Sequence, residues 1–270
     1  MSRFDDKTVL ITGASAGLGA ALAQAFAHEG ASLVLLARRL ERLEVLATSL
    51  RMQGCVVQVF RCDVAQPSEW EAVLAELART ATCVDVAVAN VGFGVVGNIQ
   101  QLDIEDYRRQ FETNVFGVLQ TFYALQGKWL SSKGSLVVIG SIAGYVAQPG
   151  GSAYVMSKFA LRALCDSIRA DLAKTGISVT LITAGLLETD FRRVDNQNYF
   201  HADKNDPFPQ WLSLSAESAA RQIVLATPQA GRANHYRAWQ SHCVVATTLS
   251  VADPVPVQVW RRGAPAGIED

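Results

Sequence analysis

The chain has 270 residues, of which 50% are hydrophobic and 18% are charged. This balance excludes a disordered protein, and five cysteines in a chain of this length exclude a small disulfide-stabilised scaffold. Lysine and arginine number 24 against 25 acidic residues, a net charge of −1, so no basic excess predicts binding to nucleic acid or to an anionic membrane.

Short apolar runs alternate with longer helical patterns along most of the chain. The runs expected to be strands are Thr8–Thr12, Ser32–Ala37, Val56–Phe60, Val84–Ala89, Ser135–Gly140 and Ile177–Thr183. Helical spacing separates them at Ala20–Glu29, Arg38–Gln53, Pro67–Thr80, Ile104–Leu130 and Ala153–Thr175, and returns at Ala216–Ala226. Apolar strands without alternation indicate burial on both faces, and strand–helix alternation indicates parallel pairing. We therefore predict one α/β domain, a doubly wound parallel sheet of Rossmann type.

No targeting signal or membrane span is expected. Two aspartates and a lysine precede the first apolar run, which is not the pattern of a secretory signal peptide. No stretch approaches the roughly 18 to 20 apolar residues of a spanning helix. We expect a cytoplasmic protein with reduced cysteines that serve as small buried hydrophobic residues, and no metal site.

A glycine-rich turn, TGASAGLG from Thr12 to Gly19, joins the first strand to the first helix. Glycine is needed where the chain turns sharply and where a pyrophosphate approaches the backbone. The helix N-terminus adds free N–H donors and a partial positive charge. The position predicts a dinucleotide site, whereas the alternative is a tight turn with small residues for packing. Its candidate residues are Gly13, Ser15, Gly17, Leu18 and Gly19.

This spacing, Thr-Gly-x-x-x-Gly-x-Gly, resembles that of the short-chain dehydrogenase/reductase family, and further motifs agree with it. They are Asn114 in the long middle helix, Ser141 after the fifth strand, Tyr154 and Lys158 as Tyr-x-x-x-Lys, and Asp63 with Val64 as the adenine-contact pair. The resemblance runs from about Asp6 to Tyr236. It implies hydride transfer between a nicotinamide and a ketone, an aldehyde or a secondary alcohol, as in a carbonyl reductase or alcohol dehydrogenase.

The residue types agree with that chemistry. Tyr154 and Lys158 are four residues apart on a predicted helix, so they share one face, and the ammonium is expected to lower the pKa of the phenol. The resemblance implies that Tyr154 is the general acid/base and that Lys158 also binds the nicotinamide ribose. It further implies that Ser141 holds the substrate oxygen and that Asn114 holds a water of a proton relay. The alternatives are a half-buried tyrosine, a solvated lysine, a serine cap and a core asparagine.

The end of the second strand bears on the choice of nicotinamide. An NAD site of this architecture places an acidic residue there, but the chain reads Ala37-Arg38-Arg39, with no acid before Glu41. Arginine binds a 2′-phosphate through paired, charge-assisted hydrogen bonds. We predict NADP(H), with Arg38 as the main contact and Ser15 and Arg39 assisting. The alternative is that both arginines belong to the exposed start of a helix.

Two loops depart from the family pattern but keep its chemical groups. After the fourth strand, Asn90 and Gly92 are present with Val91 between them, and both are expected to contact the cofactor. After the sixth strand, Gly185 follows an alanine in place of the family's proline, and Thr189 is carried over as a contact to the cofactor carboxamide.

The C-terminal part is expected to supply a substrate flap and an extension. We expect a dinucleotide-binding catalytic domain over 1–238, with the flap at about 186–215, and a C-terminal extension over 239–270. Aromatic residues in the flap predict an apolar or aromatic small-molecule substrate, although they could equally anchor a surface loop; they are Phe191, Tyr199, Phe200, Phe208 and Trp211.

The family also implies a homodimer or homotetramer. Apolar residues at helical spacing on the catalytic helix, Leu161, Leu164, Ile168 and Leu172, could form its interface or face the sheet. The competing function is a non-catalytic NADP(H)-sensing binding protein on the same fold. A sensor needs only the glycine turn and Arg38, so the complete set of Asn, Ser, Tyr and Lys favours the enzyme over it. A redox-neutral isomerase or dehydratase is a third alternative.

Overall fold

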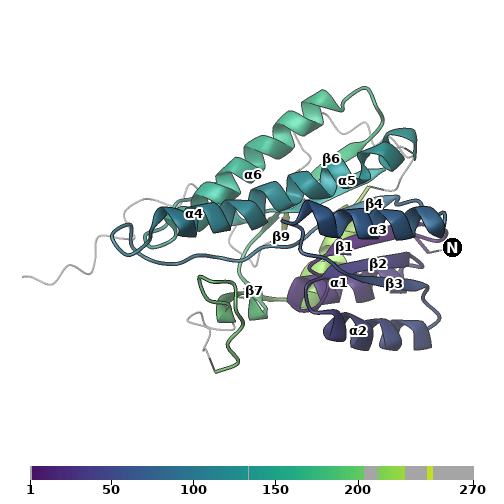
Figure 1. Ribbon diagram of the computed structural model, residues 1–270, viewed down its shortest axis with the longest axis horizontal. Coiled ribbons are helices and arrows are strands. Elements are labelled where there is room, and N and C mark those ends of the chain that lie inside the picture. Colours follow the sequence, from purple (N-terminus) through teal and green to yellow (C-terminus); the bar gives the residue numbers. More distant parts are fainter. Residues whose placement is uncertain (1, 133, 204–210, 212, 229–241, 246–270) are drawn as a thin grey trace, which may run out of the picture.

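The computed structural model describes residues 2–132, 134–203, 211, 213–228 and 242–245. A parallel sheet of seven strands, in the order β3-β2-β1-β4-β5-β6-β9, forms its centre (Figure 1). The strands are β1 Thr8–Thr12, β2 Ser32–Ala37, β3 Val57–Arg61, β4 Val86–Ala89, β5 Ser135–Ile139, β6 Ser178–Ala184 and β9 His242–Val245. The predicted doubly wound α/β fold is therefore confirmed.

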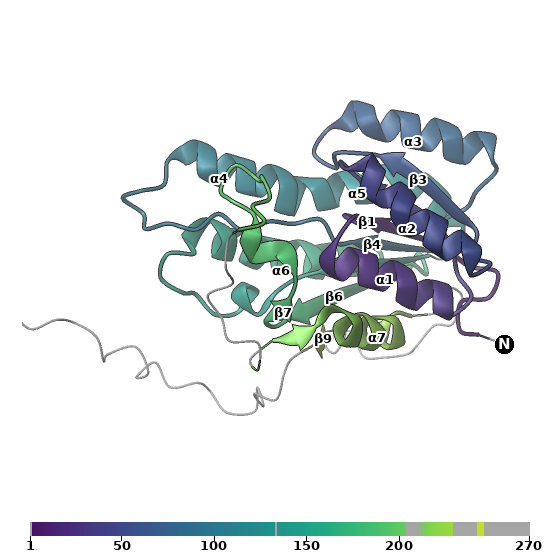
Figure 2. The same ribbon diagram turned by 90° about the horizontal axis from the view of Figure 1, so that it is seen from below.

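Helices cover both faces of the sheet, as Figures 1 and 2 show. One face packs against α1 (Gly17–His28), α2 (Leu40–Met52) and α7 (Ala216–Ala226). The other face packs against α3 (Pro67–Arg79), α5 (Gly117–Ser132) and α6 (Ser152–Asp171). The predicted helix 104–130 is present as α4 (Ile104–Phe111), a π-helical turn η1 (Glu112–Phe116) and α5. No helix in the described part of the chain is long and apolar enough to span a membrane.

The seventh strand was missed by the sequence analysis. β9 has four residues and pairs in parallel with β6, from Leu181 opposite His242 to Ala184 opposite Val245. It lies within 239–270, the stretch assigned to an extension, so four residues of that stretch belong to the sheet. The missed strand is an edge strand too short to establish a hydrophobic period by itself.

The ends of the predicted flap are paired with each other. β7 (Leu187–Glu188) and β8 (Leu214–Ser215) form a separate parallel ladder of two strands. Between them, a 3₁₀ turn η3 (Asp190–Arg193) begins the flap. Phe208 lies outside the described residues.

The strand order reverses between β1 and β4, and both neighbours run in the same direction. At such a switch point the connections leave to opposite faces, and a crevice opens beyond the carboxyl ends of the strands. Most of the candidate residues follow strands at this edge. The fold therefore places them at its topologically favoured binding position.

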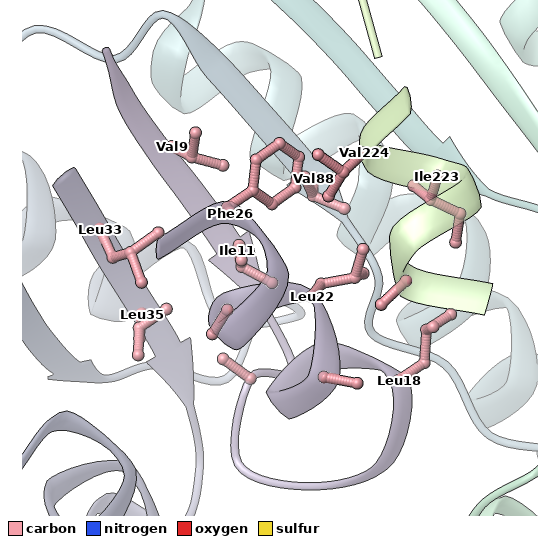
Figure 3. Packing of buried hydrophobic residues seen from close by; sticks show 14 of the residues in the cluster. Val9, Ile11, Leu18, Leu22, Phe26, Leu33, Leu35, Val88, Ile223 and Val224 are labelled. Carbon is pink, nitrogen blue, oxygen red and sulfur yellow. The ribbon is translucent and has the colours of Figure 1, made fainter. Parts of the chain in front are cut away.

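The core beside this crevice is built around α1. Phe26 is fully buried and meets the ring of Phe4 edge to face, with ring centroids 5.1 Å apart. Figure 3 shows Leu22 and Phe26 between the sheet residues Val9 and Ile11 and the helix α7. Because α7 follows the flap in the chain, this cluster ties the segment after the flap to the first βαβ unit.

Phe26→Ala is expected to lower the free energy of unfolding by about 3–5 kcal/mol, because it removes a buried ring and leaves a cavity. Val45→Ala is the control, since Val45 on α2 is 75% exposed and its substitution should cost less than about 0.5 kcal/mol. Guanidinium unfolding followed by circular dichroism measures both values. A cost as small for Phe26→Ala as for Val45→Ala would contradict the packing described for α1.

Candidate active site

The glycine turn is a close-packed backbone structure that requires its glycines. Gly13 and Gly17 have φ values of +69° and +53°, a region that side chains disfavour. A Cβ atom on Gly19 would collide with the carbonyl oxygen of Gly13. A Cβ on Gly17 would come within 3.2 Å of the Cβ of Thr189, so the start of the flap lies directly beside the turn.

Asn90 joins the turn to the end of β4. Its Nδ2 donates to the carbonyl oxygen of Thr12 at 3.0 Å, and its backbone N–H donates to the Thr12 hydroxyl at 3.0 Å. That hydroxyl in turn donates to the carbonyl oxygen of Val88 at 3.3 Å. The side-chain amide of Asn90, which is expected to contact the cofactor, is thus hydrogen-bonded to the start of the glycine turn.

The Tyr-x-x-x-Lys pair lies on the first turns of α6 and points toward the same edge. Ser141, which follows the end of β5, lies near enough to the Tyr154 phenol for its side chain to lower the pKa of that phenol. Lys158 is only 6% exposed, and its Nζ donates to the carbonyl oxygen of Ile139 at 3.0 Å. The same Nζ lies 5.7 Å from the centroid of the Tyr154 ring.

The pKa of Tyr154 is raised in the structure, whereas the sequence analysis expected it to be lowered. Burial raises the pKa of Tyr154, and it outweighs the lowering of that pKa by the side chain of Ser141 and by the charge of Arg192. Burial also lowers the pKa of Lys158 to about 8. The expectation of a lowered pKa considered only the nearby ammonium. It failed because the spacing of two residues does not show how much water the fold removes from the phenol.

Asn114 lies in the π-helical turn between α4 and α5 and is fully buried. Its Oδ1 accepts from the N–H of Phe93 at 3.1 Å, and its Nδ2 donates to the Phe93 carbonyl at 3.0 Å and to the Ser157 hydroxyl at 3.2 Å. The side chain thus makes the hydrogen bonds of a core asparagine, which was the alternative. Its role in a proton relay stays a prediction.

Gln110 is a positioning residue that the sequence analysis missed. It is fully buried, and its amide donates to the Phe93 carbonyl at 2.7 Å and accepts from the N–H of Val95 at 2.7 Å. Together with Asn114, one helical turn later, it fixes the loop after β4. A Cβ on Gly92 in this loop would lie 3.8 Å from Nζ of Lys158. Two amide side chains four residues apart in one helix were the available signal.

Arginines cluster where β2 ends. Arg39 donates from Nη2 to the Ser15 hydroxyl at 3.2 Å, and exposed Arg38 donates from Nη2 to the carbonyl oxygen of Asn198 in the flap at 3.3 Å. Burial, followed by the charges of Arg42 and Arg38, lowers the pKa of Arg39, and Asp190 acts in the opposite direction. The cluster is therefore a concentrated positive charge beside the glycine turn.

The remaining candidates also lie along this edge. Asp63, after β3, accepts through Oδ1 from the N–H of Ala65 at 3.1 Å, and Val64 is buried against the position of Gly117. Gly185 directly follows β6. In the flap, the ring centroid of Phe191 lies 5.6 Å from that of Tyr154, whereas Tyr199 and Trp211 are largely exposed.

The structure brings the predicted residues to one edge of the sheet. Those that follow strands are Gly13, Ser15, Gly17, Leu18, Gly19, Arg38, Arg39, Asp63, Val64, Asn90, Gly92, Ser141, Gly185 and Thr189; those that reach the edge from helices are Asn114, Tyr154 and Lys158. The glycine turn can hold a dinucleotide. The hydroxyls of Tyr154 and Ser141, with the buried amine of Lys158, can hold a carbonyl or an alcohol.

Two curated relatives are similar in sequence to this chain over most of its length. A sulfoacetaldehyde reductase of Chromohalobacter salexigens is 37% identical over 219 residues, which cover 80% of this chain and 85% of the relative. An NADP-dependent 3-hydroxy acid dehydrogenase of Schizosaccharomyces pombe is 34% identical over 233 residues, 84% of this chain and 88% of the relative.

Solved structures of oxidoreductases share the fold of this chain. An alcohol dehydrogenase from Thermococcus sibiricus, complexed with 5-hydroxy-NADP, matches with a TM-score of 0.76 and 26% identity, over 90% of this chain and 97% of that one. Matching structures include complexes with NADP and with NAD, so the fold alone does not select between them. The family model described as short chain dehydrogenase matches residues 7–199. The chain therefore belongs to the short-chain dehydrogenase/reductase family of oxidoreductases.

Proposed function

We propose that this oxidoreductase is an NADP(H)-dependent reductase of ketones or aldehydes, with Tyr154 as the general acid/base. The observation that carries the proposal is the convergence of the Tyr154 phenol, the side chain of Ser141 and the buried amine of Lys158 at one edge of the sheet. When bound, the nicotinamide supplies or accepts the hydride. The chain's own residues then have to hold the reacting oxygen and exchange its proton.

The raised pKa of Tyr154 supports the reductive direction. A phenol with a pKa above its usual value stays protonated at neutral pH, so it is a proton donor to a carbonyl oxygen. The Ser141 hydroxyl can hold the same oxygen, because its side chain lies beside the phenol. The ammonium of Lys158 stabilises the phenolate that remains after the proton has left.

The residues fit a dinucleotide with a 2′-phosphate. The glycine turn leads into the N-terminus of α1, where no side chain caps the N–H groups, and these donors suit a closely approaching pyrophosphate. Arg38 and Arg39 are placed to bind the 2′-phosphate, with Ser15 bonded to Arg39. The name of the fission-yeast relative, an NADP-dependent dehydrogenase, supports the same choice.

An apolar or aromatic substrate is proposed from the flap. Phe191 packs edge to face against Tyr154 and against Gly94, where a Cβ would come within 3.3 Å of its ring. A substrate carbonyl that reaches Tyr154 would lie close to this ring, which favours an apolar group on the substrate.

A second copy of the chain is proposed as the partner, in a homodimer or homotetramer. Of the residues suggested by the sequence, Leu161 and Ile168 are buried in the core, and Leu164 and Leu172 are partly buried against it, which favours the alternative that they face the sheet. Exposed apolar residues on η1 and α6, Phe116, Met156 and Phe159, support the proposal instead. A cytoplasmic location is proposed from the cysteines, since Cys55, Cys62, Cys83 and Cys165 are free thiols.

Tyr154→Phe is expected to reduce the rate of NADPH-dependent carbonyl reduction by about 10²–10⁴-fold, because the proton donor is lost. NADPH affinity, measured by fluorescence titration, should be unchanged. Tyr123→Phe is the matched control, since Tyr123 is 57% exposed and lies outside the site. Full activity of Tyr154→Phe on a panel of aldehydes and ketones would remove the assigned role, and no NADPH consumption by the unmodified protein would favour the sensor.

The reduction rate is expected to fall as the pH rises through about 8, the pKa to which burial lowers Lys158. The sign follows from desolvation, which favours the neutral amine, so that the ammonium is present below this pH and is lost above it. Lys158→Arg keeps the positive charge, and whatever activity it retains should decline only at higher pH. A pH–rate profile with the same basic limb in both proteins would contradict the assignment to Lys158.

Arg38→Ala is expected to weaken NADPH binding by about 10–100-fold, the effect of losing a charge-assisted hydrogen bond. NADH binding should be unchanged because NADH has no 2′-phosphate. The control is Arg79→Ala on α3, where the guanidinium is paired with Glu76 away from the site. Side-by-side fluorescence titrations of the unmodified protein and both variants give the affinities for NADPH and NADH, and equal weakening of both by Arg38→Ala would refute the phosphate assignment.

A further inference from the structure

The flap contains a compact turn, residues 195–201, that is stabilised by its own hydrogen bonds. Oδ1 of Asp195 accepts from the N–H groups of Gln197 and Tyr199 at 3.0 and 2.8 Å, and its Oδ2 lies 2.7 Å from Nε2 of His201. Asn198 adopts the left-handed backbone region at φ +66°. These bonds give the turn a defined shape, so it acts as one unit.

One side of this turn lies against the arginine cluster. The carbonyl oxygen of Asn198 accepts from Nη2 of Arg38 at 3.3 Å. The guanidinium of Arg42 lies over the ring of Phe200, with Cζ 5.4 Å from the ring centroid. The sequence analysis did not suggest Arg42 for the cofactor, because Arg42 lies in the first turn of the charged helix α2 and not at the end of β2.

The opposite side of the turn is tied to the loop after β4. The side-chain amide of Asn196 pairs with both backbone groups of Val96, accepting from its N–H and donating to its carbonyl oxygen, each at 2.9 Å. Arg109 on α4 donates from Nε to the carbonyl oxygen of Asn196 at 3.0 Å. The turn therefore spans the site, from the arginines to the loop that Gln110 and Asn114 position.

Within the described ranges, none of Arg38, Arg39 and Arg42 lies within 4.0 Å of a carboxylate oxygen. Burial, followed by the charges of Arg42 and Arg38, disfavours the protonated form of Arg39, and the charge of Asp190 offsets these effects only in part. A dianion between these groups would replace repulsion by attraction, and a phosphate offers that charge together with oxygen acceptors.

The flap contacts leave the guanidinium groups able to bind such an anion. A guanidinium stacked on a ring keeps its N–H donors at its edge, so Phe200 can hold Arg42 in position while the donors remain available. Arg38 uses one of its five N–H groups on Asn198, which restricts its orientation.

We propose that the turn 195–201 forms the outer wall of the 2′-phosphate site, with Arg42 as a third phosphate-binding cation held by Phe200. This inference rests on the proposed use of NADP(H). It makes recognition of the 2′-phosphate depend on the flap, and it makes Asn198 and Phe200 residues that determine cofactor specificity.

The test uses two nucleotide fragments, adenosine 2′,5′-bisphosphate and adenosine 5′-monophosphate, and isothermal titration calorimetry on the full chain. We expect the unmodified protein to bind the bisphosphate more tightly. Arg42→Gln should weaken bisphosphate binding by about tenfold, as expected for a lost charge-assisted hydrogen bond, and leave monophosphate binding unchanged. Phe200→Leu keeps an apolar side chain but loses the ring, and should weaken bisphosphate binding by about two- to fivefold. Arg79→Gln, a surface arginine on α3, is the control.

Hydrogen–deuterium exchange provides a readout that does not depend on catalysis. Binding of the bisphosphate should slow the exchange of the backbone amides of Gln197 and Tyr199, while the monophosphate should not. If Arg42→Gln and Phe200→Leu keep the full preference for the bisphosphate, the wall assignment is wrong and the NADP(H) proposal stands. If the unmodified protein binds both fragments equally, the NADP(H) proposal fails and the wall assignment fails with it.

Discussion

The hydrogen bonds between Asn90 and Thr12 join the carboxyl ends of β1 and β4, where the strand order of the sheet reverses. The glycine turn can lie so close to β4 only because Gly19 leaves room for the carbonyl oxygen of Gly13. The same close approach sets the path of the next residues, which brings Gly92 beside Lys158. The hydrogen bonds at this one junction thus connect the glycine turn to the loop beside the buried amine of Lys158.

Features set by local spacing could be predicted from the sequence. Six strands, the glycine turn and the shared helix face of Tyr154 and Lys158 depend on residue order within one or two elements, and the structure contains them all. Features set by the environment could not be predicted. The pKa of Tyr154 depends on how deeply the flap and α6 bury it, and the spacing of Leu161 and Ile168 fits a dimer interface as well as the core in which they lie. β9 forms because it pairs with β6, and this pairing cannot be predicted from the four residues of β9 alone.

The half-buried phenol of Tyr154 and the buried amine of Lys158 shift their pKa values in opposite directions. Loss of water raises the pKa of Tyr154 and lowers that of Lys158 to about 8, so it favours the neutral form of each group. Under the proposed function, the protonated phenol is the proton donor, and the ammonium beside it can return a proton to the phenolate. The loop that carries Phe93 completes the enclosure, because Gln110 and Asn114 satisfy its backbone groups without water.

The flap is closed at its base by the ladder of β7 and β8, with Leu187 opposite Leu214 and Glu188 opposite Ser215. Ser215 also caps α7, its hydroxyl accepting from the N–H of Ser218 at 3.2 Å. The chain therefore leaves and re-enters the core at a single fixed place, and the entropy of closing the intervening loop grows only slowly with its length. Insertions and substitutions between these strands are expected to leave the packing of α7 on α1 unchanged. Under the proposed function, in which the flap contacts the substrate, substrate range and fold stability are therefore separate traits of the molecule.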